Sequence, residues 1–235
     1  MTLAALPSVN SCYSLYVNHW YCPSYVHDYW NAQGGLWPST KQHAEITVTA
    51  VLLGLVLAIP LALLARRFSR LETLILGAST MIYTIPSLAL FPLLVPFTGI
   101  TKETVVIGLA LYTLTILVRN TLAGLRGVPE YVRESATGMG YGPTRLLLTV
   151  EIPLALPVIM AGLRVATVST VALTTIGSIV SYGGLGNLLA DGVQTDFKAQ
   201  ILTASVLCVL LAFLLDAGLL GVQTVLTPWA RRSRR

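Results

Sequence analysis

The sequence predicts an all-α, polytopic membrane protein, and its composition and apolar patterning lead to this fold class. Apolar residues make up 54% of the 235 residues and charged residues only 11%, with a mean hydropathy of +0.73. A soluble domain cannot bury so large an apolar fraction. Uncharged stretches such as 46–65, 73–101 and 165–190 reach the roughly 20 residues that a helix needs to cross a bilayer. Because lipid tolerates only closed backbone hydrogen bonding, these stretches are expected to be helices.

About five transmembrane spans are expected within a domain that covers residues 44–230. Residues 1–43 precede this domain as an aromatic segment outside the membrane, because they contain no apolar run long enough to span. Residues 231–235 form a basic tail. The rise of about 1.5 Å per helical residue places the spans. They are expected at about 44–66, 71–97, 104–125, 152–180 and 200–226.

The basic residues predict the orientation. With five spans the two termini lie on opposite sides, and one choice places eleven arginines on one side against three lysines on the other. The positive-inside rule then predicts a cytoplasmic C-terminus and an N-terminus outside. The net charge of +5 is therefore a signal of topology and not of nucleic-acid binding. The eleven are Arg66, Arg67, Arg70, Arg119, Arg126, Arg133, Arg145, Arg231, Arg232, Arg234 and Arg235.

The N-terminal segment is rich in aromatic residues. Tyr13, Tyr16 and Trp20 lie one turn apart if this stretch is helical, and such rings favour the membrane interface. The segment is expected either to rest on the outer leaflet or to contact a partner protein. Cys12 and Cys22 lie outside, where a disulfide can form, but spacing alone cannot establish the geometry. The sequence alone therefore leaves open whether the two cysteines form a disulfide or remain free.

The remaining histidines and the third cysteine suggest no metal site. His19, His27 and His43 have no metal-ligand spacing with a cysteine or a carboxylate, so they are interpreted as surface residues. Cys208 lies within the last span and is interpreted as a small packing residue.

The loop 127–150 predicts two short helices joined by a turn. Pro129 and Glu130 suit the first turn of a helix that runs to Thr137. A second short helix is expected from Thr144, with Pro153 and Pro157 marking the start of the fourth span. The turn between the helices is expected where glycines and a proline gather, at Gly138, Gly140, Gly142 and Pro143.

Within this loop the chain reads Glu134-Ser135-Ala136, three residues, Gly140, nine residues and Val150-Glu151-Ile152-Pro153. The pattern resembles the "EAA" loop of permease subunits of binding-protein-dependent ABC importers, with Ser135 for the usual alanine and Val150 for isoleucine. The resemblance implies a cytoplasmic loop that docks into a separate ATPase, with Glu134, Ala136 and Gly140 facing it and Tyr141 packing nearby. An ordinary amphipathic loop is the alternative.

The resemblance also implies partners and a location. The chain would be a multi-pass protein of the bacterial cytoplasmic (inner) membrane with the permease fold of methionine importers. It would pair with a second permease subunit, identical or a sister chain, with two cytoplasmic ATPase subunits and with an external solute-binding protein. The chain contains no Gly-x4-Gly-Lys-Ser/Thr motif. ATP and magnesium are therefore expected to be used by the partner, and no enzyme activity or bound cofactor is expected here.

Further stretches indicate the cargo. They resemble permeases for osmoprotectants such as glycine betaine, choline and carnitine, sometimes with proline. Another small solute, such as an amino acid or a thiol-betaine, is the alternative, and an autonomous ion-coupled carrier is a weaker one because no ionisable relay is evident. The stretches are Tyr83–Phe91, Val118–Thr121, Leu154–Arg164 and Gly183–Gly186.

The second span is expected to be broken by Pro86, Pro92 and Pro96. Such breaks occur in lipid where other helices or a cavity satisfy the freed carbonyl groups. The rings of Tyr83 and Phe91 are then expected to line a path for a cation through weak cation–π contacts. A kinked packing helix is the alternative.

Two further features concern the spans. Gly183, Gly184 and Gly186 predict a sharp turn before a short helix at 187–193, interpreted as part of an outer gate or else as a plain flexible turn. Arg164 and Asp216 lie at similar depths in spans four and five. Because an unpaired charge at the membrane centre is costly, they are expected to form an ion pair, with contact to the substrate as the alternative.

Overall fold

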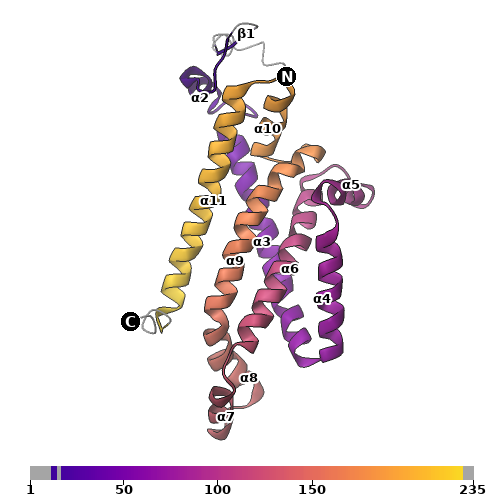
Figure 1. The fold of residues 1–235 in the computed structure, drawn as a ribbon, viewed down its shortest axis with the longest axis vertical. Helices are drawn as coiled ribbons and strands as arrows, with labels where there is room; N and C mark the ends of the chain where they lie inside the picture. The colour runs from indigo at the N-terminus through magenta and orange to yellow at the C-terminus, as the bar shows by residue number, and fades with distance from the viewer. Residues whose placement is uncertain (1–11, 15–16, 230–235) are drawn as a thin grey trace. The chain divides into compact units, whose positions relative to one another are not determined.

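The computed structural model describes residues 12–14 and 17–229, and almost all of these residues are helical (Figure 1). Tyr16, residues 1–11 of the aromatic segment and the expected basic tail at 231–235 lie outside the described residues. In chain order the elements are β1 (Tyr13–Ser14), β2 (Val17–Asn18), α2 (Pro23–Tyr29), α3 (Leu36–Arg67), α4 (Ser69–Thr84), α5 (Ser87–Thr98), α6 (Lys102–Arg126), α7 (Glu130–Gly138), α8 (Pro143–Leu146), the π-helical η2 (Leu147–Glu151), α9 (Ile152–Thr174), the 3₁₀ helix η3 (Thr175–Val180), α10 (Leu185–Gln194) and α11 (Lys198–Leu226).

The all-α, multi-spanning fold is confirmed. Within the described part of the chain, four helical runs are long and apolar enough to cross a membrane: Leu36–Arg67, Lys102–Arg126, Pro143–Val180 and Lys198–Leu226. The bent pair α4 and α5 would make a fifth. The first of these helices begins at Leu36, eight residues before the expected boundary. The polar residues of its first turns do not stop it, since none of them is a strong helix breaker.

The described N-terminal stretch begins with a hairpin, so the condition under which its aromatic residues would lie one helical turn apart is not met. Tyr13 pairs with Asn18 and Ser14 with Val17 in a two-residue antiparallel hairpin. The helical spacing of Tyr13 and Trp20 therefore does not hold. A hairpin places alternate residues on opposite faces, so it cannot align side chains as a helix does.

The break in the second span occurs at one proline. The chain bends by 103° between α4 and α5, where Ile85 is extended and Pro86 precedes the first residue of α5. Pro92 and Pro96 lie inside α5, so the prediction of three breaks was wrong. Each proline removes one N–H from the helix, and neighbouring groups in a membrane protein can compensate for the loss. The residue before a proline avoids the helical region, which explains the position of the bend.

The chain divides into two compact units, and each is described by itself. The first comprises Met1–Ala50, Pro86–Leu109 and Ser169–Leu214, and the second comprises Val51–Ile85, Ala110–Val168 and Leu215–Arg235. The first unit has two apolar clusters. The buried residues of one include Tyr25, Leu36, Leu185, Leu188 and Phe197, and those of the other include Ile46, Ala50, Phe91, Val105 and Leu109.

The second unit is held together by small residues at helix contacts. Gly54 of α3 lies directly against Thr113 of α6, and a Cβ atom at Gly124 of α6 would lie 3.0 Å from the carbonyl oxygen of Ala155 in α9. Small residues allow helix backbones to approach closely, which replaces the hydrophobic driving force that lipid cannot supply. The buried apolar residues of this unit include Ala58, Leu114, Leu117, Val118, Leu163 and Ala166.

Candidate functional site

The segment between α6 and α9 forms the two short helices and the turn that the sequence predicts (Figure 1). Pro129 precedes α7 with φ −58° and ψ 141°. The backbone N–H of Gly140 donates to the carbonyl oxygen of Thr137 over 2.9 Å, and Gly140 itself has φ +84°. This left-handed conformation suits glycine and reverses the chain. Gly142 then leads into α8, whose first residue is Pro143.

The exposed face of this segment differs in part from the expectation. Glu134, Ser135 and Gly140 are exposed and Tyr141 is half-buried. Ala136 is only 3% exposed, so the expectation that it faces a partner protein was wrong for this conformation. A small residue on the inner face of a short amphipathic helix packs against its own chain.

Two large side chains on this face were missed by the sequence reasoning. Tyr131 is 70% exposed and Met139 is 71% exposed. Tyr131 precedes Glu134 by three residues on α7, so the two lie on the same face. The spacing of Tyr131 and Glu134 in the sequence could have identified this contact face, because tyrosine is enriched at protein interfaces. The guanidinium carbon of Arg145 lies 4.3 Å from the centre of the Tyr141 ring and supports that ring.

The end of the motif is built differently from the expectation. Pro153 is the second residue of α9, and the helical run from Pro143 to Val180 passes through it without a break. Proline has no backbone N–H, so it donates no hydrogen bond to the preceding turn, which here is the π-helical η2. Glu151, which the sequence reasoning left without a role, is 2% exposed and forms a bidentate pair with Arg66 of α3.

Tyr83 lies at the bend between α4 and α5. Its side chain is 50% exposed, and its ring meets that of Tyr112 edge-on, with centroids 5.8 Å apart and an interplanar angle of 78°. The hydroxyl of Tyr112 donates to the carbonyl oxygen of Ile85, which ends α4. Of the two rings that were predicted to line a path, that of Tyr83 is accessible.

Phe91 does not line a path. Its side chain is fully buried, and a Cβ atom at Gly108 would lie 2.8 Å from the ring. The ring packs with Ile46, Val105 and Leu109 in an apolar cluster. The expectation for Phe91 was wrong, because the proximity of an aromatic residue to a helix break does not fix the face on which it lies.

The glycines at 183–186 form a tightly packed turn. Gly184 has φ +56°, and a Cβ atom on it would lie 2.6 Å from the Cβ atom of His43. The N–H of Gly183 donates to the side-chain oxygen of Asn187 over 3.0 Å. Gly186 lies directly against the backbone of Thr175. This packing favours a fixed turn over the plain flexible turn that was the alternative.

His43 is the main error of the sequence reasoning in this region. It was interpreted as a surface residue, but it is fully buried, with Nε2 2.9 Å from the carbonyl oxygen of Val171. α9 continues at Thr175 into the 3₁₀ helix η3. The imidazole donates its hydrogen bond to a carbonyl group just before the helix changes from α to 3₁₀ geometry. No local pattern in the sequence reveals a partner 128 residues away.

Beside the glycine turn is an open groove of about 450 Å³, within the first unit. Its lining is almost entirely apolar and comes from α5, η3 and α10. The lining residues include Leu88, Ile176, Ile179, Leu189 and Val193.

Arg164 of α9 and Asp216 of α11 form a two-pronged ion pair. The Nε atom of Arg164 lies 2.8 Å from Oδ1 of Asp216, and Nη2 lies 2.7 Å from Oδ2. Each side chain is about three-tenths exposed in the isolated chain. Such paired geometry is the strong form of a charge-assisted hydrogen bond.

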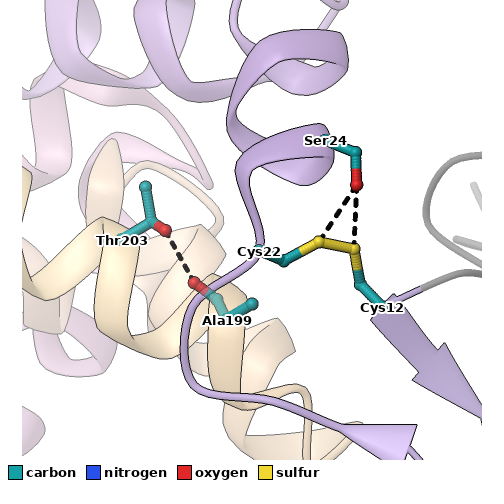
Figure 2. The surroundings of a disulfide bond; sticks show 5 residues. All are labelled: Cys12, Cys22, Ser24, Ala199 and Thr203. Atoms are coloured by element: carbon teal, nitrogen blue, oxygen red, sulfur yellow. Dashed lines mark hydrogen bonds between the residues drawn. A yellow bond between two sulfur atoms is a disulfide. The ribbon is translucent and has the colours of Figure 1, made fainter.

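Cys12 and Cys22 form a disulfide, with Cα atoms 6.0 Å apart (Figure 2). The hydroxyl of Ser24 lies 3.2 Å from the sulfur of Cys12 and 3.1 Å from that of Cys22. Both cysteines are buried in the apolar cluster that contains Ala199 of α11. The bond therefore closes a loop within the N-terminal stretch, and the two cysteines pack in the same cluster as the first turn of α11.

The aromatic residues around this disulfide divide into a buried and an exposed group. Tyr25 stacks on Tyr29 and meets Phe197 edge-on, and burial raises the pKa of its hydroxyl well above the usual value. Trp20 and Tyr21 are 57% and 72% exposed.

In the described part of the chain, no group of three or more His, Cys, Asp or Glu residues is placed to hold a metal ion.

Comparison with known proteins shows which transport proteins the chain is similar to. Residues 50–232 match the family model described as the binding-protein-dependent transport system inner membrane component. The chain is 39% identical over 209 residues to the osmoprotectant import permease protein OsmW of Salmonella typhimurium, with 86% of this chain and 97% of the relative covered. It is 35% identical to the carnitine transport permease protein OpuCB of Listeria monocytogenes and 34% identical to the choline transport system permease protein OpuBB of Bacillus subtilis. Each match covers 83% of this chain and 90% of the relative.

The solved structures show the fold. A chain of the MetNI methionine ABC transporter in an inward-facing conformation superposes with a TM-score of 0.74 and 20% identity, covering 82% of this chain and 96% of that one. A second crystal form of the same transporter gives a TM-score of 0.70. The methionine-importer-like permease fold expected from the sequence is confirmed.

Proposed function

We propose, on the premise that this chain belongs to the family of binding-protein-dependent transport system inner membrane components, that it imports osmoprotectants of the quaternary-amine class. Membership of the family makes the chain a multi-pass permease subunit of an ABC importer in the cytoplasmic membrane. The cargo is the further step. Glycine betaine, choline and carnitine are the first candidates, followed by proline.

One observation carries the choice of cargo. The relatives that match more than four-fifths of the chain at 32–39% identity are named for carnitine, choline, glycine betaine or osmoprotectants. The accessible ring of Tyr83, backed by Tyr112, fits this cargo, because the face of a tyrosine ring attracts a cation that lacks hydrogen-bond donors. A single accessible ring gives weak contact, as a path through the membrane requires.

The coupling segment comprises α7, the glycine turn and α8, and in this proposal it receives the movement of a partner ATPase. Its exposed face offers Tyr131, Glu134 and Met139 to a cleft of that partner. The complex would hold two permease chains, identical or sister, above two ATPase chains that use ATP and magnesium. An external binding protein would deliver the solute, and this chain would hydrolyse nothing itself.

The orientation follows from the arginines. Arg66, Arg126 and Arg133 belong to the same unit as the coupling segment, and short basic loops stay in the cytoplasm. The N-terminal segment then lies outside, where a disulfide between Cys12 and Cys22 is stable.

The test is reconstitution with its partners. The chain is copurified with its ATPase subunits, placed in liposomes, and supplied with ATP and the loaded binding protein. We expect uptake of radiolabelled glycine betaine, choline or carnitine that competes with the other two and stops without ATP. Saturable uptake of only an amino acid would overturn the cargo, and uptake by the chain without any ATPase would overturn the importer.

A further inference from the structure

Glu151 is the most deeply buried carboxylate of the second unit within the described residues, and it lies where three elements meet. It ends the π-helical segment η2, and its side chain is 3% exposed. Arg66, at the end of α3, binds both of its oxygens, with Nη1 2.5 Å from Oε2. A buried carboxylate is stable only when paired in this way. Short π-helical segments are frequent at functional positions.

Arg133 of α7 lies within ion-pair distance of Glu151 but donates no hydrogen bond to it. Its Nε atom lies 3.9 Å from Oε1 of Glu151, which is too far for a hydrogen bond. That N–H is buried and has no acceptor, while Nη2 donates to the carbonyl oxygen of Val128 over 2.8 Å. An unsatisfied buried donor is costly. A displacement of about 1 Å, the difference from an ordinary hydrogen bond, would satisfy it.

The surroundings permit this displacement. An open cavity of about 360 Å³ borders the Arg66–Glu151 pair, lined also by Leu63, Pro143 and Leu147. An ionised carboxylate can accept several hydrogen bonds at once, so it can bind two guanidinium groups. Glu151 can thus gain Arg133 without releasing Arg66.

We propose that Glu151 is a positioning residue for coupling, whose carboxylate holds Arg66 in this conformation and binds Arg133 as well once the partner ATPase displaces α7. The inference rests on the proposed function, because α7 must be the element that the ATPase moves. In one state the Glu151 carboxylate of η2 forms hydrogen bonds to α3 alone. In the other it forms hydrogen bonds to both α3 and α7. The three elements then move as one body, so the movement of the coupling segment reaches α3.

The test compares three variants in the complex copurified with its ATPase subunits. Glu151→Gln keeps the shape of the side chain and removes its charge. Arg133→Lys keeps the charge of α7 and removes the Nε donor. Glu72→Gln is the matched control, since Glu72 forms a similar carboxylate–arginine pair with Arg126.

The first readout is the distance between spin labels on α3 and α7, at Leu64→Cys and Thr137→Cys, in a Cys208→Ala background. Both labelled positions are exposed. The distance distribution is measured without nucleotide and after trapping with ATP and vanadate. The second readout is the amount of solute taken up per ATP hydrolysed. The distances do not depend on which solute is carried, so they test the coupling role of Glu151 even if the proposed cargo is wrong.

We expect two distinct distance distributions in the wild type and in Glu72→Gln. Glu151→Gln should give one broad distribution in both states and lower the uptake per ATP about tenfold, a typical size for coupling between sites. Arg133→Lys should keep the nucleotide-free distribution and lose the trapped one. If Glu151→Gln keeps both distributions and the wild-type uptake per ATP while only its thermal stability falls, Glu151 is merely structural and the inference is overturned.

Discussion

Removing Arg164 tests whether the ion pair with Asp216 is structural. The two hydrogen bonds of 2.7 and 2.8 Å hold both oxygens of Asp216, so Arg164→Met leaves an ionised carboxylate among apolar helices. A lone charge near the bilayer centre costs about 2.5–3.5 kcal/mol.

The assay is a double-mutant cycle on the assembled complex. Arg164→Met and Asp216→Leu are each expected to lower the unfolding temperature in detergent, by about 2–4 °C per kcal/mol for a chain of this size. The double variant leaves no unpaired charge and should recover most of the loss, since apolar replacement of a buried pair is often neutral. Transport by the double variant should then remain.

Two results would refute this reasoning. If Arg164→Met assembles with the stability of the wild type but transports nothing, the arginine acts on the solute or on the transport movement. If the double variant is no more stable than either single variant, the two charges do not stabilise one another. Either result would favour a role of the pair in the translocation path over a structural role.

Three further predictions concern the backbone and the disulfide. Cys12→Ser opens a short loop and should cost about 2–3 kcal/mol, seen as faster proteolysis of the N-terminal segment under oxidising conditions only. Gly140→Ala, at φ +84°, should cost about 1–2 kcal/mol and reduce coupled ATPase activity, whereas Gly138→Ala should not. The Cβ atom of Gly184→Ala would lie 2.6 Å from the Cβ atom of His43 in α3 and 2.7 Å from its backbone N and Cα atoms. The substitution should cost about 2–4 kcal/mol in thermal unfolding, and Gly221→Ala, in open space, should cost little.

The sequence predicts well what depends on local chemistry. Apolar runs locate the spans because lipid imposes a minimum length, and the turn of the coupling segment follows from the conformational freedom of Gly140. It predicts less well which side of a helix faces the protein. Phe91 was placed on the wrong face, because the low amphipathicity of membrane helices removes the periodic signal that marks a buried face in a soluble protein. Ala136 lies on α7 outside the spans, and its placement came from the motif resemblance and not from a periodic signal.

The wrong prediction for His43 has a physical cause that other buried polar residues share. Where a helix ends or bends inside an apolar protein, its carbonyl groups lose their partners, and side chains from elsewhere must supply them. Tyr112 donates to Ile85 at the end of α4, and His43 donates to Val171 just before α9 changes to the 3₁₀ geometry of η3. Gln200 donates to the carbonyl oxygen of Leu188 over 2.8 Å, although Leu188 lies inside α10 and not at its end. Each of these polar side chains serves a carbonyl group elsewhere in the chain, and the sequence alone does not say which one.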